Sequence, residues 1–552
     1  MKHKIKHKIY IAVAAVAATV SIYAVRNDDF ALTRNIEIMI NLMREISENY
    51  VDQVDTDLLL EYAAEGISRR LDPYTEYLPE KEMSSFEVLT TGKYGGIGSL
   101  IRKDSDYVKI AQPYEGSPAD RAGLIIGDRI VAIDGEDAAG WDTEQVSAHL
   151  KGTPSSAVEV TVRRLVSGED ETLRIVREKI AIPGIPYYGF VGDPADGVGY
   201  VQHSDFTVGV AQDMRAAIEE MQAQGLKALI LDYRNNGGGI MQEAVDVVSL
   251  FTPRGTEVVT LKGRRDSAVY STTKRPAFEH LPLAVLINEN SASASEIVAG
   301  SLQDLDRAVL VGAKSFGKGL VQSPRPVGYN SYVKMTTSKY YIPSGRCIQE
   351  LDYSDHSSSG KAVKVADSLR HAFYTKGGRE VFDGGGISPD ESIEAEYISR
   401  FAATLYALGH IDNYGDDYFR RNFESTIDVE NFTITEQDYE DFCTMIGMQD
   451  IKYESASRGV LKALKEAASS DLYADLSAKI EEIEAEIKDD TASNLESYRD
   501  EIIESINANI ILRYAYQAGV IRNSLVRDKE VARAVEILLD EQRYNSILNP
   551  EK

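Results

Sequence analysis

Cysteine is nearly absent from this chain. Its 552 residues hold two, Cys347 and Cys443, and neither stands in a C-x-x-C spacing. That pattern argues against a structural zinc site, and no other feature of the sequence requires a metal or an organic cofactor. The sequence also offers no positive evidence for a disulfide between the two cysteines.

Basic residues are in the minority, with 60 lysines and arginines against 87 aspartates and glutamates and a formal net charge of -27. Because binding to phosphate groups needs clustered lysine and arginine, this balance argues against a nucleic-acid partner. The acidic excess says little about substrates, since it more often serves solubility. An apolar fraction of 43% and a charged fraction of 27% are ordinary for a folded soluble protein.

Histidine is scarce as well, with eight residues in the chain. His203 follows an expected strand, but no serine motif of the G-x-S-x-G type accompanies it. His149 lies in a β-rich segment, and His280 precedes a strand bounded by proline. We interpret all three as structural or exposed, so no serine–histidine triad is predicted.

The N-terminus carries a long apolar run. Residues 9–25 are uncharged and apolar, and they follow four lysines: Lys2, Lys4, Lys6 and Lys8. The run is at the short end of what spans a bilayer and longer than many signal-peptide cores. Because positive charge precedes it and almost none follows, we expect the N-terminus inside and the rest of the chain outside. We favour an uncleaved inner-membrane anchor slightly over a cleaved signal peptide; a buried N-terminal helix is the alternative.

The length of the chain exceeds that of one hydrophobic core, and a prior of roughly one domain per 100–200 residues suggests about three or four domains. Changes in pattern along the sequence predict five segments. These are an anchor or signal segment at 1–27, an N-terminal helical region at 28–88, a β-rich module at 89–180, a region of alternating strands and helices at 181–398, and an acidic helical region at 399–552.

Within these segments the expected elements are short. The β-rich module is predicted to hold strands at 108–110, 129–133, 158–162 and 173–176 and helices at 117–122 and 143–150. The next region is predicted to hold strands at 199–202, 226–232, 283–287 and 308–311 and helices at 208–222 and 293–302, with one more ending near 250. Strands separated by helices of this length predict a largely parallel sheet, which is an α/β arrangement. Together with the β-rich module and the two helical regions, this makes the predicted fold class of the whole chain multidomain α+β.

Three polar motifs follow strands of this region. Asn290–Glu296 places Ser293 at a strand-to-helix turn, where its hydroxyl meets the positive end of a helix dipole. The same residues also fit a capping box that merely starts a helix. Asp232–Gly239 ends in three glycines, whose backbone can turn sharply and expose N–H groups, or can simply form a flexible loop.

The third motif is Gly317–Gln322. A lysine between two glycines, Lys318, has no helix face to occupy and can point inward. Burial would desolvate its ammonium group and lower its pKa, which makes a usable general base. An exposed loop lysine is the alternative.

In combination, the three motifs resemble those of the carboxy-terminal-processing (tail-specific) proteases. The resemblance covers roughly residues 50–396 and implies a ClpP/crotonase-like α/β core. It implies that Ser293 is the nucleophile, Lys318 its general base, and Gln322 the residue that orients the lysine. It also implies an oxyanion hole made by the Ala294 N–H and one glycine N–H. We assign that second donor to Gly238, with Gly237 and Gly239 as alternatives. The chain departs from the commoner family pattern at Tyr233 and Cys347, and neither departure affects the Ser293/Lys318 pair.

The β-rich module resembles a PDZ domain. Tyr94–Gly98 matches the loop that binds a terminal carboxylate, which makes Gly95, Gly96, Ile97 and Gly98 the predicted peptide-binding residues. In such modules loop N–H groups bind the carboxylate while the peptide adds a strand to the sheet edge. The expected partners are therefore proteins or peptides with free C-terminal tails. The module can act as a tether, which we favour, or as a lid.

The combined prediction is a serine endopeptidase on the periplasmic side of a bacterial cell envelope, with a homodimer or adaptor surface expected on the helical C-terminal region. Two other functions are less consistent with the sequence. A catalytically idle PDZ scaffold would lack Ser293 or Lys318, and both are present. A crotonase-like acyl-thioester enzyme uses glycine N–H groups in the same way but has no use for a serine–lysine pair.

Overall fold

The computed structural model describes residues 30–549, apart from 84–85, 87, 89–90, 354–361, 450, 452, 454–455, 468–478, 481 and 484–490. The predicted anchor or signal segment lies outside the described residues. Among the helices that are described, none is both long and apolar enough to cross a membrane. The chain forms two compact units: unit 1 comprises Met1–Met83, Gln322–Thr337 and Tyr353–Ala362, and unit 2 comprises Ser84–Val321, Ser338–Asp352 and Val363–Lys552.

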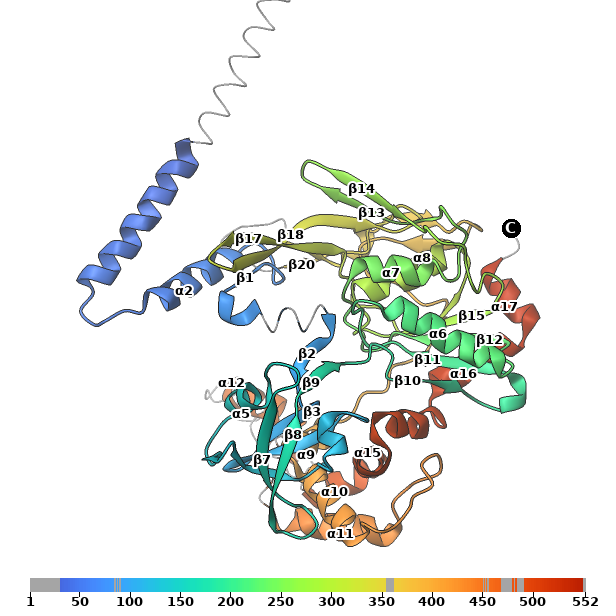
Figure 1. The fold of residues 1–552 in the computed structure, drawn as a ribbon. Helices are drawn as coiled ribbons and strands as arrows, with labels where there is room; N and C mark the ends of the chain where they lie inside the picture. Colours follow the sequence, from blue (N-terminus) through green and yellow to red (C-terminus); the bar gives the residue numbers. More distant parts are fainter. Residues whose placement is uncertain are drawn as a thin grey trace, which may run out of the picture. The chain divides into compact units, whose positions relative to one another are not determined.

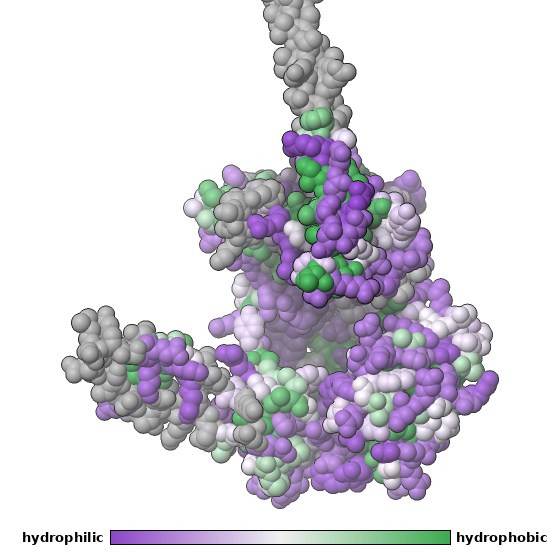
Figure 2. Space-filling view, turned by 90° about the vertical axis from the view of Figure 1, so that its left-hand side faces the viewer, coloured by the Kyte–Doolittle hydropathy of each residue, from purple (hydrophilic) through white to green (hydrophobic). Residues whose placement is uncertain are grey.

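Unit 1 combines N-terminal helices with a β-hairpin. Residues 30–49 and α2 (Thr56–Ser68) are helical, and β1 (Glu76–Leu78) pairs antiparallel with β18 (Ser331–Tyr341). The turn between β17 (Leu320–Gly328) and β18 contains Tyr329 and Asn330, both with positive φ, as a tight hairpin turn requires. Apolar side chains are exposed on the N-terminal helices, where Figure 2 shows them in green.

The central sheet of unit 2 has six strands in the order β10-β11-β12-β15-β16-β23. In this sheet, strands β11, β12, β15, β16 and β23 run parallel to one another, and β10 is antiparallel to β11. The strands in the middle are buried along their whole length, which is typical of a parallel sheet covered on both faces. Their bounds are β10 (Tyr187–Phe190), β11 (Val198–Gln202), β12 (Ala228–Asp232), β15 (Leu283–Ile287), β16 (Val309–Gly312) and β23 (Glu391–Ser392).

Alternate residues of these strands pack against two different helical layers. Leu229 and Leu231 of β12 pack with α6 (Val210–Ala223), α7 (Met241–Val248) and α8 (Ala294–Asp304). Their neighbours Ala228 and Ile230 pack with α16 (Lys529–Leu539) and α17 (Glu541–Leu548), at the C-terminal end of the chain. Side chains alternate across a strand, so these are opposite faces of the sheet. Figure 1 shows the first layer in green and the second in red.

An antiparallel sheet continues this core. β13 (Glu257–Gly263) pairs with β14 (Ser267–Ser271) and with the end of β18. The connections that follow hold short strands, which are β19 (Leu351–Asp352), β20 (Val363–Lys364), β21 (Ala372–Tyr374) and β22 (Glu380–Phe382).

The β-rich module has its own hydrophobic core. Its main sheet runs β3-β4-β5-β7-β8, with β6 beside β5, and β2 pairs separately with β9. Helices α4 (Pro118–Arg121) and α5 (Thr143–Leu150) lie between the strands in sequence. The strands are β2 (Lys93–Gly96), β3 (Ser99–Asp104), β4 (Tyr107–Pro113), β5 (Arg129–Ile133), β6 (Glu136–Asp137), β7 (Ala157–Arg163), β8 (Asp170–Val176) and β9 (Glu178–Ala181).

Five of the described C-terminal helices contribute to a further core. They are α9 (Arg400–Ala407), α10 (His410–Arg421), α11 (Glu436–Gly447), α14 (Thr491–Ser497) and α15 (Arg499–Leu525), which is kinked at Ala515 and Tyr516. Helix α12 (Ala456–Ala467) lies between α11 and α14 in sequence. This helical region contacts the β-rich module through ion pairs. Lys109 of β4, 2% exposed, forms ion pairs with Asp412 and Asp416 of α10.

The predicted strands and helices of both the β-rich module and the sheet region are present, most with ends within two residues of those expected. The sequence patterns did not indicate that the last two helices would form the second layer of the central sheet.

Candidate active site

Ser293 lies at the turn between strand β15 and helix α8, and its side chain is half-buried. Its backbone adopts φ 58° and ψ -111°, a region that non-glycine residues rarely occupy. Strain of this kind costs on the order of 1–3 kcal/mol and persists only where the surroundings enforce it. The Tyr340 hydroxyl donates to the Ser293 carbonyl at 3.2 Å, and the Ser293 N–H donates to Glu296 Oε2 at 2.8 Å. The turn is therefore held from both sides.

Glu296 is the centre of this arrangement, because its fully buried carboxylate accepts four hydrogen bonds. Oε1 accepts from the Ser315 hydroxyl at 2.6 Å and from the Gly317 N–H at 2.7 Å. Oε2 accepts from the N–H groups of Ser293 at 2.8 Å and Lys318 at 2.9 Å. Burial raises the pKa of Glu296, and the hydrogen bonds oppose that rise. Because the N–H groups of Ser293 and Lys318 donate to the same oxygen, the two backbone segments lie close together.

Close packing explains the glycines on either side of Lys318. A Cβ on Gly317, whose φ is +86°, would lie 2.6 Å from Glu350 Cβ. A Cβ on Gly319 would lie 2.8 Å from the Gln349 backbone nitrogen. Larger residues would therefore displace the segment that carries the lysine. Lys318 itself is half-buried.

Asn236 fastens the glycine-rich loop after β12 to its neighbours. It is fully buried, and its side-chain amide donates to the His203 carbonyl at 2.6 Å. Its own carbonyl accepts from the Ala292 N–H at 3.0 Å and the Ser295 hydroxyl at 2.9 Å. The loop is thereby joined both to the end of β11 and to the start of α8.

Gly238 lies directly against the Ser293 turn. A Cβ there would lie 2.8 Å from the Ala292 carbonyl oxygen and 2.9 Å from Ser293 Cβ, and φ is +103°. The Gly238 N–H donates to Asn236 Oδ1 at 2.8 Å, so an oxyanion would have to replace that acceptor. Within the described residues, the N–H groups of Ala294 and Gly237 have no acceptor. The assignment of the second oxyanion donor to Gly238 thus stays a prediction, with Gly237 as its structural rival.

The three histidines considered from the sequence are unsuited to catalysis. His203 is fully buried, and burial lowers its pKa to about 3, so it stays neutral near pH 7. Its ring packs on Phe206 at 4.1 Å between centroids. His149 is exposed and stacks on Trp141, and His280 is exposed.

The predicted carboxylate loop opens the β-rich module. Gly95 and Gly96 end strand β2, Ile97 is buried, and Gly98 has φ +78° with Ser117 packed where a Cβ would be. β3 follows directly and is an edge strand of its sheet, and α5 contacts it. An edge strand has unpaired backbone groups, so an extended peptide can add to it.

Gln322 belongs to strand β17 in unit 1, where its side-chain amide donates to Thr336 Oγ1 at 3.1 Å. Its predicted role toward Lys318 stays a prediction.

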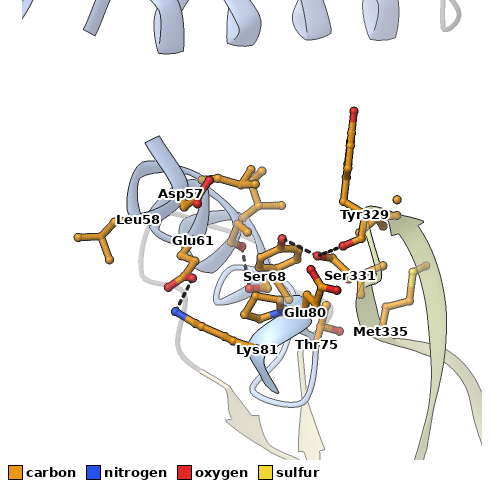
Figure 3. A pocket seen from close by; sticks show the side chains of 18 of the residues that line it. Asp57, Leu58, Glu61, Ser68, Thr75, Glu80, Lys81, Tyr329, Ser331 and Met335 are labelled. Atoms are coloured by element: carbon orange, nitrogen blue, oxygen red, sulfur yellow. Dashed lines mark hydrogen bonds and ion pairs between the residues drawn. The ribbon is translucent and has the colours of Figure 1, made fainter. Parts of the chain in front are cut away.

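A hollow of about 1220 Å³ lies within unit 1, between α2 and the hairpin of β17 and β18 (Figure 3). Its lining is largely apolar and includes Leu58, Ile67 and Met335, and Lys81 pairs with Glu61 at one side. None of the predicted catalytic residues lines it. Among the described residues there is likewise no cluster of histidine, cysteine and acidic side chains that fits a metal ion.

Reasoning from sequence missed the residues that hold the site together. Asn236 lies inside the glycine-rich motif and Glu296 inside the helix-cap motif, and the sequence patterns assign neither residue a role in the site. Asn236 lies four positions after the end of β12 and Glu296 nine positions after the end of β15, so the signal they share is a polar residue shortly after a strongly apolar strand, at the sheet edge where parallel strands end.

Comparison with known proteins assigns three parts of the chain to known families. The model of "Peptidase family S41" matches residues 197–356, that of a "PDZ domain" matches 109–164, and that of "Probable PDZ-protease, C-terminal helical domain" matches 401–538. A "Carboxy-terminal-processing protease" of Bartonella bacilliformis is 33% identical over 315 residues, which cover 56% of this chain and 71% of that protein. A "Probable CtpA-like serine protease" of Staphylococcus aureus is 32% identical over 317 residues, 57% of this chain and 62% of that protein.

Among solved structures, a "photosystem II D1 C-terminal processing protease" aligns with a TM-score of 0.35 at 26% identity, covering 65% of this chain and 87% of that one. The sequence matches alone suffice for the assignment: the chain belongs to the carboxy-terminal-processing proteases of peptidase family S41, and it is a serine-type peptidase with a PDZ domain and a C-terminal helical domain.

Proposed function

We propose that the protein is an endopeptidase in which Ser293 is the nucleophile and Lys318 the general base. The observation that carries this proposal is the Glu296 carboxylate, one oxygen of which binds the N–H groups of both residues. This contact keeps the strained serine turn and the lysine segment together although 25 positions separate them in sequence. A capping role for Ser293 alone would not require the lysine segment to share the same carboxylate.

The chemistry follows from these positions. Neutral Lys318 takes the proton of the Ser293 hydroxyl, whose oxygen attacks the scissile carbonyl. The Ala294 N–H and one glycine N–H, from Gly238 or Gly237, bind the oxyanion. Protonated Lys318 then gives its proton to the leaving amine, and water releases the acyl group from Ser293. Gln322 orients the lysine in this scheme.

The PDZ domain selects the substrate in our proposal. Gly95–Gly98 provides backbone N–H groups for a terminal carboxylate, and the open edge of β3 accepts the extended tail. Proteins with free C-terminal tails are therefore the proposed substrates, with the PDZ domain as tether rather than lid.

Location, partners and domain limits complete the proposal. The lysines and apolar run at 2–25 favour export and an inner-membrane anchor, which would place the peptidase on the periplasmic side of a bacterial envelope with envelope proteins as substrates. We retain the segments 1–27, 28–88, 89–180, 181–398 and 399–552 as domain limits and a ClpP/crotonase-like core at 181–398. The C-terminal helical domain remains the proposed surface for a homodimer or an adaptor.

The decisive experiment measures cleavage of an unstructured protein by the wild type and by Ser293→Ala, Lys318→Ala and Lys318→Arg. All three variants should be inactive while still folded, since a guanidinium stays protonated and cannot replace a lysine base. Lys314→Ala is the matched control from the same loop and should stay active, because Lys314 is paired with Glu350. Retained activity in either alanine variant of the pair would refute the proposal. A wild type that binds tails without cleaving would indicate a scaffold.

A further inference from the structure

The glycine-rich loop makes a contact that the peptidase mechanism does not use. Arg234, two residues after the end of β12, extends its side chain to the start of helix α16. Its guanidinium lies 2.7 Å from Asp528 Oδ2 and also pairs with Glu530. Nearly 300 positions separate these residues in sequence, so the contact is purely a product of the fold.

The arginine is fixed on its other side by Asp232, the last residue of β12. Asp232 accepts hydrogen bonds from the Arg234 N–H at 2.9 Å and from Nε at 3.0 Å. The Tyr200 hydroxyl donates to the second Asp232 oxygen at 2.7 Å. The Arg234 side chain is 16% exposed and that of Asp232 is 2% exposed, so water screens these charges little.

Helix α16 is rigidly placed for this role. Asp528 caps it, since Oδ1 accepts the N–H groups of Glu530 at 2.9 Å and Val531 at 3.0 Å while Oδ2 is left for the arginine. The apolar face of α16 is buried against the central sheet. The absence of a side chain at Gly312 leaves room for Glu530, whose Oε1 would lie 3.2 Å from a Cβ there.

The loop held in this way is the loop that carries the proposed oxyanion donors. Arg234 is followed by Asn235, whose N–H donates to Asn288 Oδ1 at 2.9 Å, and then by Asn236 and the glycines. Without the carboxylates of Asp528 and Glu530, Asp232 at the end of β12 would be the one acidic partner left to the guanidinium among the described residues. The loop would then lose its attachment to the second helical layer.

We infer that Asp528 and Glu530 are positioning residues for peptide cleavage: through Arg234 they hold the glycine-rich loop at the distance from Ser293 that oxyanion binding requires. This inference rests on the proposed function. It gives the C-terminal end of the chain a share in the active site, although it supplies no group that touches the substrate.

The test compares Asp528→Asn, Glu530→Gln and the double variant with the wild type. Asparagine keeps the helix cap, and both changes keep the side-chain size while removing the charge. We expect the double variant to lower kcat by about 10- to 100-fold, as a small misplacement of catalytic groups does, with KM within about twofold. Its affinity for a peptide boronic acid, which mimics the oxyanion, should fall by the same factor. Glu536→Gln, on the same helix but 63% exposed, should match the wild type.

If Asp528 and Glu530 had only a structural role, kcat and boronate affinity would be unchanged once both are corrected for the fraction of folded protein. An unchanged kcat or an unchanged boronate affinity in the double variant therefore overturns the inference. A second test uses Arg234→Gln, which removes the charge that pairs with Asp528 and Glu530. If the carboxylates act through Arg234, adding Asp528→Asn and Glu530→Gln to this variant should lower kcat little further; losses that multiply would contradict the inference. Ser293→Ala in the same assay separates the two proposals. If it remains active, the proposed function fails; if it is inactive while the carboxylate variants retain full kcat, only the inference fails.

Discussion

Replacing Gly238 by alanine should disable the site through two independent conflicts. The residue has φ +103°, which costs an alanine about 1–2 kcal/mol. The added Cβ would also lie 2.8 Å from the Ala292 carbonyl oxygen and 2.9 Å from Ser293 Cβ, both parts of the proposed nucleophile turn. Either the loop or the turn must therefore shift.

The size of the effect follows from what shifts. A displacement of about 1 Å near reacting groups costs on the order of 100-fold in rate, and loss of one oxyanion donor costs about 3 kcal/mol, or 100- to 1000-fold. We therefore expect Gly238→Ala to lower kcat by roughly 100- to 1000-fold, and to lower the free energy of unfolding by about 1–3 kcal/mol. Initial rates on an unstructured protein and thermal unfolding measure the two effects.

Gly237→Ala is the matched control. No atom lies within 4 Å of a Cβ at Gly237, its φ is not positive, and an alanine keeps the N–H that is the rival oxyanion donor. Its kcat should stay within a few-fold of the wild type. If Gly238→Ala cleaves at the wild-type rate, or if Gly237→Ala is equally damaging, the proposed contact between the loop and the serine turn is wrong.

Three further predictions concern protons and the substrate tail. Because a lysine base acts in its neutral form, cleavage should rise with pH, and His203→Gln should keep the shape of the profile since burial holds the pKa of His203 at about 3; a steady fall in activity from about pH 6 to 9 in folded protein would contradict a Lys318 base. Burial alone would raise the pKa of Asp412, but Arg513 and Lys109 hold it at about 2. This ion pairing therefore stabilises the protein above about pH 4 and is lost as pH falls toward 2, so Asp412→Asn should flatten the pH dependence of unfolding in that window; an unchanged slope would argue against the pairing. Amidating the C-terminus of a tailed peptide should weaken binding by about 1.5–3 kcal/mol in calorimetry, if a charged hydrogen-bonded contact is lost, and equal affinities would refute the PDZ role.

Local patterns were sufficient for most elements of the central sheet and the PDZ domain. Val158–Val162 alternates as a half-buried strand does, and Leu283–Ile287 is a continuous apolar run between turn signals. Both Ser293 and Lys318 stand out because each follows such a run. Because these signals depend only on neighbouring residues, the elements that they predict are present in the folded chain.

The contacts that organise the site are not local, and this is why the sequence did not reveal them. Glu296 satisfies a local cap pattern whether or not Lys318 shares its carboxylate. The pairing of Arg234 with Asp528 depends on α16 crossing the far face of the sheet, which no periodicity in α16 specifies. The bond from the Gly238 N–H to Asn236 is local, but it depends on a loop conformation that a glycine-rich sequence leaves open.

The central claim is that Ser293 becomes acylated with Lys318 as its base. The most direct measurement is to quench a mixture of enzyme and an activated peptide ester at short times and to locate the acyl group by peptide mass spectrometry. We expect it on Ser293 in the wild type, more slowly formed in Lys318→Ala by about 100-fold or more, and absent in Ser293→Ala. An acyl group on another residue, or one that forms on Ser293 at the wild-type rate without Lys318, would contradict the proposed pair.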